Sequence, residues 1–271
     1  MADPFVVASR IAFARRVGWL VSEPRDAQEM IRRSRVRVKN FDLNAHREFD
    51  PERYLRGFEV DVDLRQPDFE FTVVRGEGEY VALTSPSGMS QRWSQRRPRR
   101  RAFFHPAAMF PKLSRALVNL SRVREGETLL DPFSGTGSIP IEAAMVGVNA
   151  VAMDMASKMS QGSAANMRMF KQDWMGVLRA DAFSPPLIRV DAVVTDVPYG
   201  RASSTNGMSR ADILARSVRA FEPLLDPGSR IVLMHAKGGA PTYANGLELE
   251  EEHDLYVHKL LTRTISVLRK R

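Results

Sequence analysis

Apolar runs alternate with amphipathic stretches through the second half of the chain. Turn-bounded apolar runs predict strands at residues 128 to 132, 149 to 154, 176 to 181, 190 to 196 and 229 to 234. Helical spacing of apolar residues predicts helices at 111 to 123, 137 to 147, 156 to 171 and 210 to 224. This alternation predicts an α/β fold with a parallel sheet. Residues 247 to 270 predict two adjoining strands, which suit an antiparallel hairpin at the sheet edge.

The N-terminal part follows a different pattern of short strands and turns. RVRVKNF (35 to 41) alternates as a strand does, and FEFTVVRGEGEYVAL (69 to 83) predicts a hairpin. Helices are expected at 10 to 20, at 25 to 33 and within 49 to 60. The polar, turn-rich segment from residue 85 marks a linker. We therefore expect a small α+β region at 1 to 84, a basic linker at 85 to 102 and the α/β domain at 103 to 271.

Composition restricts the classes of protein that the chain can belong to. The chain has 271 residues, of which 44% are hydrophobic, enough for one large domain or two smaller ones. It contains no cysteine, which excludes disulfides, thiolate metal ligands and a cysteine nucleophile. Its five histidines are scattered, so we expect no metal site. No apolar stretch approaches the length of a membrane span, and we expect a soluble, cytoplasmic protein with no membrane partner.

Charge points to a polyanionic partner. The net charge is +8 and the isoelectric point is near 10.1. The densest run of charge has Trp93 among its arginines and no acidic residue, and comprises Arg92, Arg96, Arg97, Arg99, Arg100 and Arg101. We predict that this run contacts nucleic-acid phosphates, and a solvated linker is the alternative interpretation.

The segment DPFSGTG (131 to 137) predicts a ligand site where a strand passes into a helix. Glycines at 135 and 137 allow the backbone to approach a ligand closely. A phosphate loop would need a lysine followed by Ser or Thr, which this segment lacks. Asp131 ends the strand at the site itself, and its charge suits a cationic ligand better than a pyrophosphate. A dinucleotide-binding fold stays an alternative.

Acidic residues end four consecutive predicted strands, at Asp131, Asp154, Asp181 and Asp196. The carboxyl ends of parallel strands meet at one edge of a sheet, where ligands bind. Asp154 is placed to accept hydrogen bonds from ribose hydroxyls, a feature that NAD enzymes share. Any one of these acids alone would be explained as well by a helix cap. Their repetition favours a common site.

The segment TDVPYG (195 to 200) resembles the acceptor motif of class I methyltransferases that use S-adenosylmethionine and modify exocyclic amino groups. That motif is Asp or Asn, Pro, Pro and an aromatic residue, and Asp196, Val197, Pro198 and Tyr199 match it at three of four places. With FFHPAAMFPKLSRALVNLS (103 to 121), the chain is similar to the archaeal tRNA guanine-10 N2-methyltransferases. VDLRQPDFEFTVV (62 to 74) resembles part of the tRNA-binding THUMP region of that family.

The resemblance implies a class I, Rossmann-like methyltransferase sheet preceded by a small α+β THUMP-like region. It implies that Met155 packs on adenine, that Asp181 accepts from the adenine amino group and that the Ala182 amide also contacts the base. The cofactor-binding residues so expected are Asp131, Ser134, Gly135, Gly137, Asp154, Met155, Asp181 and Ala182. The catalytic residues so expected are Asp196, Pro198 and Tyr199.

Transfer to an exocyclic amine requires acceptors for its hydrogens, so that the nitrogen lone pair can face the methyl carbon. Asp196 and the carbonyl of residue 197 supply two acceptors, and Tyr199 can stack on a base held out of its helix. Val197 replaces the first proline of the motif, which removes a fixed φ angle. We expect activity with weaker pre-organisation of this turn.

The resulting prediction is S-adenosylmethionine-dependent methylation of the N2 of guanosine in tRNA, at position ten by resemblance, with one or two methyl groups. The alternatives are an N6-adenine or ribosomal-RNA guanine methyltransferase, and a non-catalytic RNA-binding protein that retains the fold. The N-terminal region is shorter than in the family that it resembles, which leaves room for an activating protein subunit beside tRNA.

Overall fold

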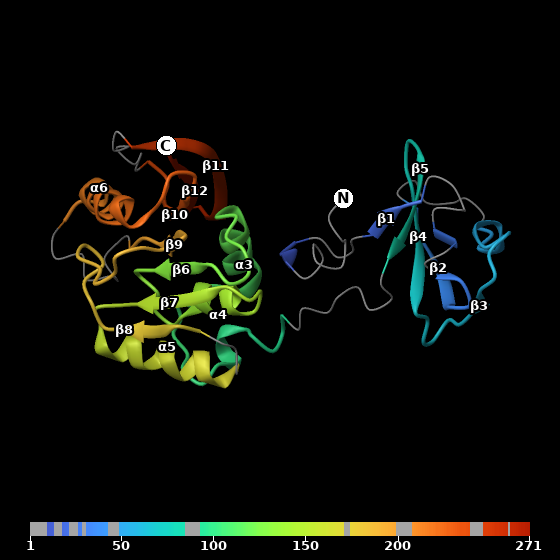
Figure 1. Ribbon diagram of the computed structural model, residues 1–271, viewed down its shortest axis with the longest axis horizontal. Coiled ribbons are helices and arrows are strands. Elements are labelled where there is room, and N and C mark those ends of the chain that lie inside the picture. Colours follow the sequence, from blue (N-terminus) through green and yellow to red (C-terminus); the bar gives the residue numbers. More distant parts are fainter. Residues whose placement is uncertain are drawn as a thin grey trace. The chain divides into compact units, whose positions relative to one another are not determined.

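The computed structural model describes residues 10–13, 18–21, 27–28, 31–42, 49–84, 93–170, 174–198, 208–238, 246–259 and 261–271. The chain divides into two compact units, Met1–Gln91 and Arg92–Arg271 (Figure 1). This boundary falls inside the segment expected to be a linker. Residues 93 to 102 therefore belong to the second unit.

The first unit contains a five-stranded sheet with the order β1-β5-β4-β2-β3. Its strands are β1 (Gly18–Leu20), β2 (Arg35–Asp42), β3 (Asp61–Val62), β4 (Phe69–Arg75) and β5 (Glu79–Thr84). The expected hairpin is confirmed, because β4 pairs antiparallel with β5, whereas β2 runs parallel to β3 and β4. Alternate residues of these strands, including Val36, Phe71 and Leu83, bury one face of the sheet around Ile31.

Two expectations for this unit were wrong. Gly18–Leu20, expected to end a helix, is strand β1, in register with Ala82 to Thr84 of β5. A side chain at position 18 would lie 2.3 Å from the Leu83 carbonyl oxygen, so glycine allows this close pairing. Trp19 then packs against the core, a tertiary contact that outweighs local helix preference. Within residues 49 to 60 only the 3-10 turn Glu52–Tyr54 forms, directly after Pro51.

The second unit contains a seven-stranded sheet with the order β11-β12-β10-β9-β6-β7-β8. Its parallel strands are β6 (Thr128–Asp131), β7 (Asn149–Met153), β8 (Gly176–Leu178), β9 (Ala192–Asp196) and β10 (Arg230–Ala236). The strands β11 (Leu247–His258) and β12 (Leu261–Lys270) form an antiparallel hairpin, and β12 pairs antiparallel with β10. The expected α/β sheet with a C-terminal antiparallel hairpin is confirmed.

Helices cover both faces of this sheet (Figure 1). On one face, α3 (Pro111–Leu120), α4 (Ser138–Ala144) and α5 (Ser157–Met169) share a core cluster that includes Leu129. On the other face, α6 (Arg210–Phe221) packs in a cluster that includes Leu130. Neighbouring residues of β6 therefore face opposite cores, as the strand pleat requires. Among the described residues, no helix is long and apolar enough to cross a membrane.

Candidate active site

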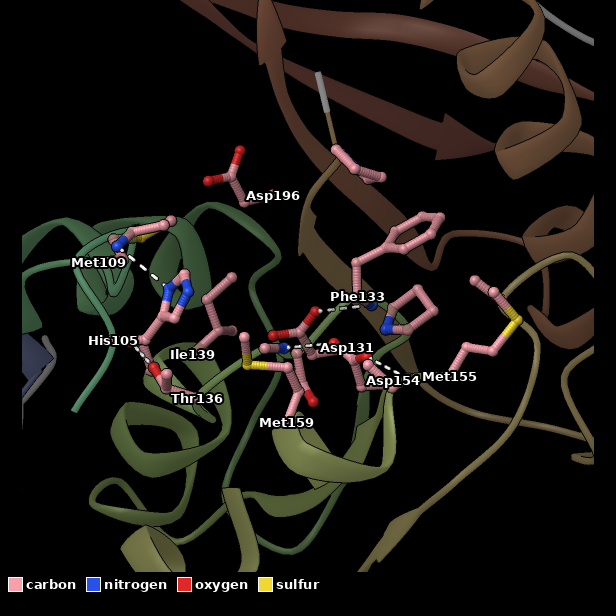
Figure 2. A pocket seen from close by; sticks show the side chains of 18 of the residues that line it. His105, Met109, Asp131, Phe133, Thr136, Ile139, Asp154, Met155, Met159 and Asp196 are labelled. Atoms are coloured by element: carbon pink, nitrogen blue, oxygen red, sulfur yellow. Dashed lines mark hydrogen bonds between the residues drawn. The ribbon is translucent and has the colours of Figure 1, made fainter. Parts of the chain in front are cut away.

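A pocket of about 730 Å³ lies at the carboxyl ends of β6, β7, β8 and β9. Its lining includes Asp131, Asp154, Asp181 and Asp196, the four strand-end acids. Figure 2 shows Asp131, Asp154 and Asp196 around this space, with His105 and Met109 on the side away from Met155. The structure thus brings the strand-end acids to one pocket, as the parallel sheet predicts.

The turn after β6 opens onto the pocket at Gly135 but not at Gly137. Gly135 has φ +50° and nothing within 4 Å of an added Cβ, and its amide donates to Asp154 Oδ2 at 3.0 Å. Gly137 has φ +79° and is absent from the pocket lining, and an added Cβ would lie 2.5 Å from Ser163 Oγ. Gly135 therefore leaves room for a ligand, whereas Gly137 lets the turn pack on α5. Ser134, also in the lining, has a buried Oγ without a hydrogen-bond partner among the described residues.

The residues after β7 and β8 form a second part of the pocket wall. Asp154 Oδ1 accepts from the Ala156 amide at 2.8 Å, which with the Gly135 contact fixes its carboxylate. Met155 follows, lines the pocket and is 53% exposed. Asp181 accepts from the Phe183 amide at 2.9 Å, and Ala182 is buried beside it. An apolar surface between two carboxylates suits a ligand with an aromatic ring and hydroxyl or amino donors.

Asp131 is buried at the floor of the site. Its Oδ1 accepts from the Thr195 hydroxyl at 2.6 Å and from the Phe133 amide at 3.3 Å. Burial raises the pKa of Asp131 to about 8, although these two donors act in the opposite direction. The Thr195 bond also ties the end of β6 to the end of β9, where Asp196 lies.

Asp196 pairs with an arginine from the C-terminal hairpin. Arg263 Nη1 of β12 donates to Asp196 Oδ2 at 3.0 Å. Burial raises the pKa of Asp196 to about 6, and the Arg263 charge and hydrogen bond oppose that rise. Asp196 Oδ1 is buried and has no hydrogen-bond partner among the described residues. This carboxylate therefore keeps acceptor capacity at the pocket.

The motif after Asp196 is only partly described. The Val197 amide donates to the Met234 carbonyl oxygen at 2.9 Å, a hydrogen bond that proline at this position would lack. Val197 is also buried in the core on the α6 side. Pro198 lines the pocket. Tyr199 lies outside the described residues, so its stacking role stays a prediction.

Several side chains that line the pocket were given no role from the sequence. His105 and Met109 come from the segment before α3, which is anchored where Asn166 accepts from the Phe103 amide at 2.7 Å. Arg216 of α6 also lines the pocket, with its guanidinium 4.3 Å from the Phe183 ring centroid. The segment at 103 to 121 carries part of the family resemblance, but spacing along the chain gave no signal for Arg216 or Arg263.

The arginine run divides into inward and outward side chains, which corrects the prediction for two of them. Arg96 is buried and its Nε lies 2.6 Å from Glu142 Oε1. Arg101 is also buried, and donates to Ser138 Oγ at 2.6 Å and to the Met109 carbonyl oxygen at 3.2 Å. Both side chains use their donors inside the unit, because the buried Glu142 carboxylate and Ser138 at the start of α4 are paired with them. They are not placed to contact phosphate.

The remaining arginines of the run stay available to a partner. Arg97, Arg99 and Arg100 are exposed, and the Arg99 guanidinium lies 5.7 Å from the Phe104 ring centroid. Arg92 lies outside the described residues. Phosphate contact through the exposed side chains stays a prediction.

The donor set of the pocket fits a cationic organic ligand. Carboxyl groups at four strand ends line the pocket, and those that are ionised attract positive charge. The described residues contain no group of three or more His, Cys, Asp or Glu side chains able to hold a metal ion. Open space at Gly135, the partnerless Ser134 Oγ and the fixed Asp154 carboxylate fit the S-adenosylmethionine expected from the sequence.

Comparison with known proteins identifies relatives of this chain. It is 35% identical over 188 residues to a tRNA (guanine(10)-N2)-dimethyltransferase of Methanothermobacter thermautotrophicus, covering 66% of this chain and 54% of that relative. It is 32% identical over 219 residues to the protein of the same name from Methanocaldococcus jannaschii, covering 77% of this chain and 60% of that relative. The chain thus spans little more than half the length of these curated relatives.

The fold also matches that of a solved structure. The crystal structure of TrmN from Thermus thermophilus matches with a TM-score of 0.56 at 24% identity, covering 99% of this chain and 79% of that chain. This likeness supports the class I methyltransferase fold, which the seven-stranded sheet and its antiparallel hairpin share. Residues 98–263 match the model of the RMKL-like methyltransferase domain (UPF0020). The chain therefore belongs to the family of RMKL-like methyltransferase domains.

Proposed function

We propose that the protein transfers a methyl group from S-adenosylmethionine to the exocyclic N2 of a guanosine in tRNA, at position ten. The observation that carries this proposal is the Asp196 carboxylate, held at the pocket beside Pro198 with one oxygen that has no hydrogen-bond partner among the described residues. The names of the relatives, tRNA (guanine(10)-N2)-dimethyltransferases, support guanosine and tRNA. The exposed arginines and the net charge of +8 support a nucleic-acid substrate.

The cofactor would be held by the residues around the turn after β6. S-adenosylmethionine supplies a methyl group on a positively charged sulfonium. The Asp154 carboxylate, fixed by two backbone amides, would accept from ribose hydroxyls. Met155 and Ala182 would contact the adenine ring, with Asp181 accepting from its amino group. Buried Asp131, with Ser134 and Gly135 close by, would face the charged end of the molecule.

The acceptor amine would be oriented by the end of β9. Asp196 and the carbonyl of residue 197 would each accept one amine hydrogen, which turns the nitrogen lone pair toward the methyl carbon. Bond formation at nitrogen breaks the sulfur–carbon bond, and the positively charged amine then loses one proton to water or to Asp196. Orientation and charge stabilisation are the contributions of the protein here.

Val197 does not argue against this function. In the acceptor motif a proline would fix the φ angle at this position, whereas here the Val197 amide bonds to Met234 and the side chain enters the core. Both features hold residue 197 in place by other means.

Two variants test whether Asp196 acts on the acceptor amine and Asp154 on the cofactor. The purified chain is incubated with labelled S-adenosylmethionine and an unmodified tRNA transcript, and label in the RNA is measured beside cofactor affinity. Asp196→Ala should reduce transfer by at least about a thousandfold and change cofactor affinity by no more than about threefold. Asp154→Ala should weaken the cofactor by about tenfold or more. If both variants weakened the cofactor equally, the assignment of Asp196 to the acceptor would be wrong.

A further inference from the structure

We propose that Arg263 is a positioning residue for methyl transfer, which acts by orienting the Asp196 carboxylate and keeping it ionised. This inference rests on the proposed function for the role of Asp196. The contact joins two part-buried side chains, 21% exposed for Arg263 and 25% for Asp196. Such a pair is shielded from water more than a surface ion pair, so its effect on Asp196 is larger.

The sheet brings Arg263 to Asp196 across an intervening strand. Asp196 is in register with Met234 of β10, and Arg263 of β12 is in register with Ala236 of β10. The guanidinium reaches over the end of β10, where Arg263 Nη1 lies 3.7 Å from Met234 Sδ. Three adjacent strands therefore fix the geometry of the pair.

The contact anchors the carboxylate without using all of its acceptor capacity. Arg263 Nη1 donates to Oδ2, while Oδ1 has no partner among the described residues. A bidentate pairing of the guanidinium with the carboxylate would have occupied both oxygens. The observed contact limits rotation of the carboxylate and leaves acceptor sites for an amine hydrogen.

The positive charge of Arg263 also favours the ionised form of Asp196. Among the described residues, the charged or titratable groups that act on Asp196 are Arg263 from β12 and the carboxyl of Asp131 from β6, while β10 presents the uncharged Met234. Burial raises the pKa of Asp196, and Arg263 opposes this rise. Without Arg263, Asp196 would hold its proton to a higher pH, and the neutral carboxyl would be a weaker acceptor for the amine than the carboxylate. Activity would then be lost at neutral pH and regained as pH rises.

The test uses the full chain with three substitutions on one strand. Arg263→Met removes the charge, Arg263→Lys retains it, and Arg269→Met is the matched control, since Arg269 of β12 pairs with Glu248 on the exposed side. For Arg263→Met we expect kcat on tRNA at pH 7 to fall by about tenfold or more, with recovery toward pH 9. Arg263→Lys should restore part of the rate, and Arg269→Met should match the wild type. Cofactor affinity should stay within about twofold in all three.

A second readout does not depend on activity. Carbon-13 NMR titration of the aspartate carboxyls, with Asp196→Asn to assign the resonance, should show a higher pKa for Asp196 in Arg263→Met. An unchanged titration, or a loss of kcat equal at every pH, would overturn the proposal. If the wild-type chain made no methylated guanosine, the proposed function would fail, and the titration would still decide whether Arg263 controls the ionisation of Asp196.

Discussion

Two carboxyl groups at neighbouring strand ends, the buried Asp131 and the part-buried Asp196, differ in pKa because their surroundings differ. Asp131 receives hydrogen bonds from a hydroxyl and an amide, which carry no charge, and burial raises its pKa to about 8. Asp196 receives a guanidinium, and burial raises its pKa only to about 6. Near pH 7 the first therefore tends to hold a proton and the second tends to be ionised. Only an ionised carboxylate can accept from two donors through both oxygens, which suits Asp196 to the acceptor side.

This difference predicts how stability depends on pH. Between about pH 4 and pH 8 the folded chain keeps a proton on Asp131 that the unfolded chain releases, so this group lowers stability as pH rises through that window. Asp131→Asn keeps an acceptor for Thr195 and removes the titration. The difference in melting temperature between this variant and the wild type, measured without cofactor, should therefore grow by a few degrees in favour of the variant from pH 5 to pH 8. A difference that stays constant with pH would contradict the assignment, and exposed Asp226→Asn serves as the control.

At the scale of elements, the turn between β6 and α4 contains two glycines with different surroundings. Gly137 packs against α5, whereas Gly135 opens onto the pocket. Both Gly135 and Gly137 have positive φ, so alanine at either costs about 1 to 2 kcal/mol of backbone strain. Gly137→Ala adds the clash with Ser163 and should destabilise the fold more than Gly135→Ala. Gly135→Ala should instead weaken S-adenosylmethionine by at least about tenfold. Urea unfolding and calorimetric binding of both variants test this, and equal effects on binding would refute the distinction.

The elements of the second unit were predictable because each is amphipathic or apolar over its whole length. Strand-end acids at fixed positions also predicted that Asp131, Asp154, Asp181 and Asp196 share one edge. The arginines at this site were not predictable. Arg263 reaches Asp196 only through the register of β12 on β10, and Arg216 lines the pocket only through the packing of α6. Strand β1 was missed because a three-residue strand has too little pattern to compete with a helical one.

At the scale of the whole molecule, the arginine run has both inward and outward side chains. Its inward side chains join the second unit, where Glu142 lies between Arg96 at 2.6 Å and Arg115 at 2.9 Å. Its outward side chains, Arg97, Arg99 and Arg100, remain exposed. A count of arginines therefore overstates the charge that a nucleic acid can reach, because burial removes part of it.

This division predicts separate effects on binding and stability. Replacing Arg97, Arg99 and Arg100 with Ser should weaken tRNA binding and reduce the slope of log affinity against log salt by about two to three. Arg96→Ser should leave that slope unchanged and lower the free energy of unfolding by about 3 kcal/mol, because Glu142 loses a buried partner. Filter binding at several salt concentrations and urea unfolding measure the two effects. An unchanged salt slope in the triple variant would mean that these side chains are solvated and do not contact phosphate.

The central claim is transfer of a methyl group to N2 of guanosine in tRNA, and one measurement tests it most directly. An unmodified tRNA transcript, and a matched transcript with adenosine in place of guanosine ten, are incubated with the chain and S-adenosylmethionine. The RNA is digested to nucleosides and analysed by mass spectrometry. We predict N2-methylguanosine or its dimethyl form from the first transcript and neither from the second. Methylated adenosine, or no methylated nucleoside from a chain that binds the cofactor, would contradict the account.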